Sequence, residues 1–164
     1  EDRKGNGLVL TNPIKINTTL ANLDSISPRM VIDKDKEYQV AEEYRGKLKT
    51  KCPTVEQNVG NLSGGNQQKV LLAKWMFTDP DVLILDEPTR GIDVGAKYEI
   101  YCIINDLVAA GKSVIMISSE LPEVLGMSDR IYIMNEGKIA GELSAEEATQ
   151  EKIMSIIVSS GKGA

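Results

Sequence analysis

Two acidic residues, Asp86 and Glu87, directly follow the short apolar run of residues 82–85. Open α/β sheets place their ligands at the carboxyl ends of their strands, so a strand over this run would present both carboxylates at such an edge. Asp86 could then hold a Mg²⁺ ion through water, and Glu87 could polarise an attacking water molecule. The pair could equally do no more than end a strand and begin a turn at Pro88, and these residues alone leave both explanations open.

A serine and two glycines stand upstream of this acidic pair. Ser63 is expected to cap a helix over residues 66–77, with Gly64 and Gly65 at its start. A helix N-terminus attracts anions, glycines let a phosphate approach the backbone N–H groups, and the Ser63 hydroxyl adds a donor. A serine-glycine-glycine sequence by itself is most often only a loop. Its place before a strand that ends in two carboxylates makes phosphate binding the stronger interpretation.

Apolar patterns and capping residues predict the elements that would position these groups. Residues 82–85 and 113–117 are short and continuously apolar, which is typical of strands buried on both faces of a parallel sheet. Asp93 is expected to cap a helix over 94–110, which Gly111 ends. The other predicted elements are helices over 34–48, 120–126 and 145–158 and strands over 130–134 and 138–143. Strands that alternate with helices indicate an α/β fold.

Composition excludes several classes of function. The chain has 164 residues, of which 41% are hydrophobic, so one folded domain is expected. Its net charge of -5, from 19 basic and 24 acidic residues, argues against a nucleic-acid partner, which needs a basic surface. Without a histidine, no imidazole can act as a base, a metal ligand or a pH switch. Cys52 and Cys102 lack zinc-binding spacing, and no apolar run reaches the roughly 20 residues that span a bilayer.

Together the motifs resemble those of the ATP-binding-cassette (ABC) superfamily. Residues 62–68 (LSGGNQQ) resemble its signature loop, residues 82–89 (VLILDEPT) its Walker B strand, and residues 91–93 (GID) its D-loop. A finer pattern is similar to the second cassette of monosaccharide importers, whose ATP-binding subunits carry two cassettes on one polypeptide. That pattern lies in residues 1–4, 89–97 and 118–130. The resemblance covers essentially the whole chain.

The resemblance implies a partial P-loop NTPase fold, in which a parallel-sheet core carries an α-helical subdomain. Residues 1–78 would form the segment beside the Q-loop, with Glu1 in the Q-loop region, and the helical subdomain. Residues 79–164 would form part of the core, with the Walker B strand, the D-loop residue Asp93, a switch region and a C-terminal strand and helix. The loops of residues 11–59 would recognise the membrane partner.

In this superfamily two cassettes face each other head to tail, and each signature loop closes over the ATP that the other cassette holds. The resemblance therefore implies that a set of residues contacts an ATP bound in trans, namely Ser63, Gly64, Gly65 and Gln67. They would supply backbone donors and a helix dipole to the γ-phosphate. Asp86, which would hold Mg²⁺ through water, and Glu87 would be the catalytic carboxylates.

Two departures from the family pattern concern the chain's own ATP site. Residues 111–113 (GKS) imitate the end of a phosphate-binding loop, but Asp106 stands where a glycine is required, and a helix precedes the motif where a strand should. We therefore expect these residues to end a helix, the true loop to lie upstream of this chain, and the isolated chain to be inactive. Ser119 occupies the place of the switch histidine and lacks an imidazole's reach and charge. The site is expected to be degenerate, although Glu87 is retained.

The implied fold also predicts an unpaired edge. The strand of the phosphate-binding loop would lie between the strands over 113–117 and 130–134. Without it, two strand edges lose their partner, which is costly unless they are covered. We expect the two strands to pair directly, a strand from a second chain to fill the slot, or the sheet to be split and locally mobile.

The leading hypothesis is the ATP-hydrolysing subunit of a bacterial sugar importer, at the cytoplasmic face of the plasma membrane. It would bind ATP and Mg²⁺, a partner cassette and a transmembrane permease, and would act indirectly with a sugar-binding protein. An alternative is a non-hydrolysing coupling module, which Ser119 favours and Glu87 disfavours. A third hypothesis, a soluble cassette ATPase of translation or DNA repair, is disfavoured by the acidic balance and by residues 118–130. The sequence does not identify the sugar.

Overall fold

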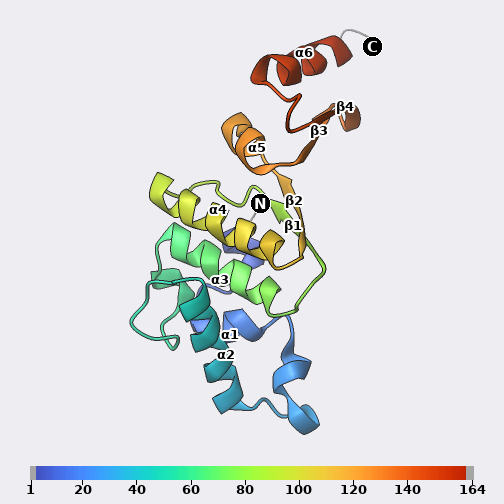
Figure 1. Cartoon of the computed structure of the whole chain (residues 1–164). Helices are drawn as coiled ribbons and strands as arrows, with labels where there is room; N and C mark the ends of the chain where they lie inside the picture. Colours follow the sequence, from blue (N-terminus) through green and yellow to red (C-terminus); the bar gives the residue numbers. More distant parts are fainter. Residues whose placement is uncertain (1–2, 162–164) are drawn as a thin grey trace. The chain divides into compact units, whose positions relative to one another are not determined.

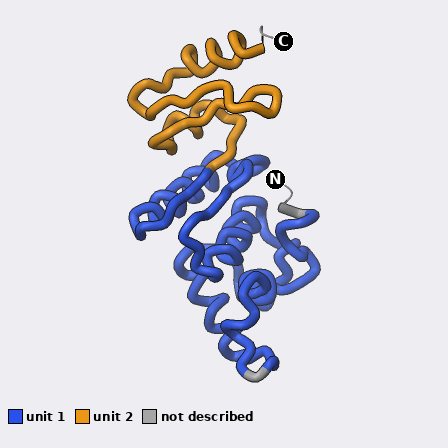
Figure 2. Tube along the Cα trace, turned by 90° about the vertical axis from the view of Figure 1, so that its right-hand side faces the viewer, with its two compact units in different colours: residues 1–115 blue, residues 116–164 orange. Residues whose placement is uncertain are grey.

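The computed structural model describes residues 3–161, and the chain forms two compact units, residues 1–115 and 116–164 (Figure 2). The first unit holds α1 (Ile14–Thr19), α2 (Lys34–Lys47), α3 (Gly64–Met76), β1 (Val82–Asp86), α4 (Val94–Ala109) and the first residues of β2 (Ser113–Ile117). Short π- and 3₁₀-helical turns lie at Arg3–Gly7, Leu23–Ile26, Pro28–Met30 and Val59–Asn61. The division at residue 78 into a helical subdomain and a core part stays a prediction.

The helices α1 to α3 of the first unit lie together (Figure 1), and this helical part has its own apolar core. The core residues are Leu8, Ile14, Ala41, Val55, Val59, Leu62 and Val70. The sequence predicted α2, which the structure confirms, but it did not predict α1, because a six-residue helix is too short to show a period. Fully buried Asn17 fastens α1 to the chain before it, since its Oδ1 accepts from Val9 N at 2.8 Å and its Nδ2 donates to Val9 O at 3.0 Å.

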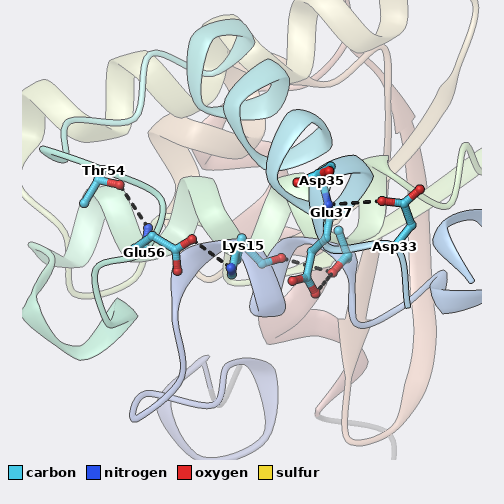
Figure 3. A network of polar contacts seen from close by, with 7 residues as sticks. Lys15, Asp33, Asp35, Glu37, Thr54 and Glu56 are labelled. Atoms are coloured by element: carbon cyan, nitrogen blue, oxygen red, sulfur yellow. Dashed lines mark hydrogen bonds and ion pairs between the residues drawn. The ribbon is translucent and has the colours of Figure 1, made fainter. Parts of the chain in front are cut away.

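Polar side chains tie α1 to its neighbours (Figure 3). Lys15 on α1 forms an ion pair with Glu56 at 2.7 Å, and Thr19 on α1 donates to Glu37 on α2 at 3.3 Å. Asp33 accepts from Asp35 N at 3.1 Å, as Figure 3 shows, and so caps α2. These contacts join α1 to α2 and to the segment around Glu56, and Asp33 sets where α2 begins.

Strands β1 and β2 pair in a two-stranded sheet, and α4 connects them. Ser113 N donates to Asp81 O at 2.9 Å, so the two strands begin side by side. The expectation that both strands are buried on both faces is wrong. In β1, Leu83 and Leu85 are buried, whereas Ile84 is 63% exposed, and no residue of β2 is buried. The cause is that only one face of β1 is covered by the described residues, so continuous apolarity here does not mean two covered faces.

The second unit holds α5 (Leu121–Met127), β3 (Arg130–Asn135), β4 (Lys138–Ser144) and α6 (Gln150–Ser160). β3 and β4 form an antiparallel hairpin whose turn, Glu136 and Gly137, has positive φ at both residues. The buried core residues of this unit are Ile131, Ile133 and Ile153. The last helix begins at Gln150, capped by Thr149, and not at residue 145 as predicted, because residues 145–147 form a turn.

The strands fall into two separate two-stranded sheets, β1 with β2 and β3 with β4. Of the three arrangements expected around the missing strand, direct pairing of β2 with β3 is therefore not found within residues 3–161. The described strands are divided between two sheets, and the expected local mobility stays a prediction. Within the same residues, every helix is too short or too polar to cross a membrane.

Candidate functional site

Ser63 caps α3 and keeps its side chain exposed. Its Oγ accepts from Asn66 Nδ2 at 2.9 Å and, at the longer distance of 3.5 Å, from Asn66 N. The structure thus confirms the predicted cap, and it begins the helix two residues earlier than predicted, at Gly64. The hydroxyl oxygen is used as an acceptor, so its proton is available to a ligand.

Gly65 lies where α3 meets α4. A Cβ added at this position would stand 2.5 Å from the Cβ of Ala96, a distance that real side chains do not tolerate. Gly65 is therefore required by helix packing, whatever else it does. Ala96 is also the residue whose N–H donates to the capping carboxylate of Asp93 at 2.9 Å. The contact thus brings the signature end of α3 beside the D-loop end of α4.

Lys69 makes the second connection between these helices. Its side chain is only 2% exposed, and its Nζ lies 2.8 Å from Glu99 Oε2 on α4. The same Nζ donates to Lys49 O, in the segment that follows α2, at 3.0 Å. The buried ammonium thus has two partners and holds three segments together.

The ion pair between Lys69 and Glu99 predicts that the free energy of unfolding depends on pH. The hydrogen bond from Lys69 lowers the pKa of Glu99 from its ordinary value of 4.5. A lowered folded-state pKa contributes stability that is present above the unfolded value and is lost as the pH falls through the folded one. We expect Glu99→Gln to lower the urea midpoint at neutral pH, and the difference from the wild type to disappear in acid. A difference that is equal at both pH values would show that the carboxylate charge contributes nothing.

Asp86 and Glu87 lie at the carboxyl end of β1, as predicted. Glu87 has a positive φ of 48°, and its carbonyl accepts from Arg90 N at 3.2 Å, so the chain turns sharply just after Asp86. Asp86 lines a cleft of about 370 Å³ in the first unit, and the lining also includes Gln68, Leu71, Trp75 and Ile84.

Among the described residues no group of three or more Cys, Asp or Glu side chains converges on a metal site. A single exposed carboxylate fits Mg²⁺, because that ion typically takes one or two carboxylates and completes its octahedron with water and substrate phosphates. Asp86 is exposed, at the end of its strand and on the rim of the cleft, and is the residue that would hold the ion.

Gln67 is not placed as expected. Its side chain is buried, and Nε2 donates to Val59 O at 3.3 Å and to Leu62 O at 3.2 Å, so it supports the chain that enters the signature loop. Its Oε1 is buried without a partner among the described residues. Asn66, which the sequence analysis did not single out, is the amide that contacts Ser63. Its position three residues after a cap serine was the available signal.

Of the remaining predicted residues that the structure describes, Gly64 lies beside Ser63 and Ser119 lies in the other unit. Gly64 is half-buried in the first turn of α3. Ser119 is exposed and belongs to the second unit, where the neighbouring Ser118 hydroxyl donates to Glu123. Glu1 lies outside the described residues. The expectation for residues 111–113 is confirmed, because Gly111 ends α4 with a φ of +86° and Lys112 forms an ion pair with Asp79 at 2.8 Å.

Solved structures share this architecture. An ATP-binding cassette of an ABC transporter matches with a TM-score of 0.73 and 22% identity, over 88% of this chain and 62% of that chain. An ATP-binding cassette bound to ADP and phosphate, in a dimeric post-hydrolysis state, matches with a TM-score of 0.70 and 19% identity, over 84% of this chain and 59% of that chain. The predicted fold is therefore confirmed: the chain has the α/β fold of an ATP-binding cassette.

The sequence comparisons agree with the fold. The family model described as ABC transporter matches residues 4–90, and the chain belongs to this family. It is 62% identical over 157 residues to the L-arabinose transport ATP-binding protein AraG of Geobacillus stearothermophilus, covering 96% of this chain and 31% of that protein. It is 55% identical over 159 residues to the ribose import ATP-binding protein RbsA of Clostridium perfringens, covering 96% and 32%. The chain thus spans under a third of the length of these relatives.

Proposed function

We propose that this chain is the C-terminal part of the ATP-binding subunit of a bacterial sugar importer, in which ATP hydrolysis drives monosaccharide uptake. High identity to arabinose, xylose and ribose transport proteins supports the proposal. The partners would be a second cassette, a transmembrane permease and, indirectly, a sugar-binding protein, with no nucleic acid. The subunit would lie at the cytoplasmic face of the plasma membrane. The chain alone contains no phosphate-binding loop motif and would be inactive.

One observation carries the proposal, namely the exposed Ser63 at the start of α3 with its oxygen engaged as an acceptor. Such a hydroxyl donates its proton outward, beside the backbone N–H groups of Gly64 and Gly65 and at the positive end of a helix dipole. These groups would stabilise the charge that develops on the γ-phosphate of an ATP held by the partner cassette. Asp93, at the adjoining end of α4, would accompany them as the D-loop residue.

The acidic end of β1 would serve the chain's own nucleotide. Glu87 would orient and polarise the attacking water, while Asp86 would hold Mg²⁺ through water. A bound Mg²⁺ would neutralise phosphate charge. Ser119 cannot supply the charge of an imidazole, so this second site would turn over slowly. That residue supports the alternative proposal, in which this half only couples the permease to the partner cassette.

The variant Glu87→Gln in the complete subunit distinguishes ATP hydrolysis by this half from a role in coupling alone. If this half hydrolyses ATP, turnover should fall by about two-fold or more, because the variant loses a carboxylate that acts in the transition state. The control Glu146→Gln removes an exposed carboxylate of the second unit and should leave turnover unchanged. Steady-state phosphate release from subunit and permease in vesicles measures both. Unchanged turnover in Glu87→Gln would contradict hydrolysis by this half and favour the coupling module.

A further inference from the structure

The orientation of Ser63 is set by another residue, Asn66, whose side chain makes two hydrogen bonds in opposite directions. Asn66 Oδ1 accepts from Lys51 N at 2.8 Å, and Asn66 Nδ2 donates to Ser63 Oγ at 2.9 Å. A backbone N–H is always a donor, so the first bond fixes which end of the amide is oxygen. The end that faces Ser63 must then be the NH₂ group.

This assignment decides the state of the serine hydroxyl. An NH₂ group cannot accept a hydrogen bond, so Ser63 Oγ must be the acceptor, and its own proton points elsewhere. The remaining nearby bond, from Asn66 N at 3.5 Å, also uses Oγ as an acceptor. Both contacts therefore leave Ser63 as a donor toward a ligand at the exposed helix start. An acceptor at position 66 would instead capture that proton.

The amide is in turn held by the end of α2. Lys51 belongs to the short segment after α2, in which Thr50 N bonds to Arg45 O at 2.9 Å. Lys49, in the same segment, has a φ of +51°, and its carbonyl accepts from the buried Lys69 of α3 at 3.0 Å. The side chains of Asn66 and Lys69, both on α3, thus hydrogen-bond this segment on either side of Thr50. A shift of the α2 end would move Lys51 N and with it the Asn66 amide.

We propose that Asn66 is a positioning residue, which acts through Ser63 by holding its hydroxyl as a donor toward phosphate and which takes its own orientation from the end of α2. The proposal rests on the proposed function, because it assigns Ser63 a phosphate of the trans-bound ATP. It adds a route by which the helical part of the cassette adjusts the signature loop. Asn66 itself makes no phosphate contact in this proposal.

A double-mutant cycle in the complete subunit with its permease tests this role. We expect Asn66→Ala to lower kcat for ATP by about ten-fold with little change in KM, because a donor to the transition state is lost. In a Ser63→Ala background the same change should cost no more than about two-fold, because residues that act through one another are not additive. Asn61→Ala, an exposed asparagine two residues before Ser63, is the matched control and should leave kcat unchanged.

The variant Asn66→Asp tests whether a loss of activity at this position comes only from a loss of folding stability. It keeps the acceptor for Lys51 N and adds a favourable carboxylate to the first turn of α3, so the thermal midpoint should not fall. It should nevertheless lower kcat, because the carboxylate accepts the Ser63 proton and also adds negative charge beside the phosphate. The double-mutant cycle above, and not this variant, isolates the role of Asn66. Equal losses from Asn66→Ala with and without Ser63 would overturn this inference alone. Full activity in Ser63→Ala would overturn both this inference and the role of the signature loop in the proposed function.

Discussion

Gly65→Ala is expected to lower the free energy of unfolding of the chain by about 2 kcal/mol, the typical cost of overpacking a close contact. The new Cβ would stand 2.5 Å from that of Ala96, so α3 or α4 would have to move at the ends that carry Ser63 and Asp93. Alanine favours a helix over glycine by about 1 kcal/mol, and the clash must exceed this gain. Urea unfolding of the chain, followed by far-ultraviolet circular dichroism, measures the change.

Two variants separate the clash from helix propensity. Gly46→Ala makes the same chemical change inside α2, where nothing lies within 4 Å of the added Cβ, and it should stabilise by about 0.5–1 kcal/mol. Ala96→Gly in the Gly65→Ala background exchanges the two side chains across the contact and should restore most of the loss. If Gly65→Ala stabilises the chain as Gly46→Ala does, the close approach of α3 and α4 is wrong.

Local rules predicted the elements around the site well. Ser63 and Asp93 were identified as caps because a side-chain oxygen can satisfy the free N–H groups of a first helical turn. Gly111 was identified as a helix end because glycine adopts positive φ without strain. These signals depend on only a few neighbouring residues, so the predictions made from them hold independently of the tertiary packing.

Predictions that depended on tertiary packing were less successful. The apolar run of β1 does not say how many of its faces are covered, and Ile84 is exposed where burial was expected. Within the signature helix, Gln67 and Asn66 carry the same functional group one position apart. Only the packing of α3 against Val59 and Lys51 decides which amide is buried and which faces the capping serine.

The proposed function predicts a larger effect for a charge at Gly65 than for any change in packing. A carboxylate there would occupy the positive start of α3 and would repel the γ-phosphate that Ser63 and Gly64 are proposed to contact. Gly65→Asp should therefore abolish sugar uptake in the complete subunit. Ser119→Ala should change uptake little, because the site that it serves already lacks its switch histidine. The close approach of Ala96 confounds the first variant, since any side chain at position 65 also clashes.

The substitution Ala96→Gly removes the clash between position 65 and Ala96, so the effect of a charge at position 65 can be measured by itself. Gly65→Asp with Ala96→Gly and Gly65→Ala with Ala96→Gly relieve the same contact and differ only in a carboxylate, so their comparison isolates the charge. ATP-driven sugar uptake into vesicles that contain the complete subunit and its permease is the decisive measurement. The proposed function predicts that the alanine double variant retains uptake and the aspartate double variant loses it. Equal uptake by the two would contradict a phosphate contact at the start of α3.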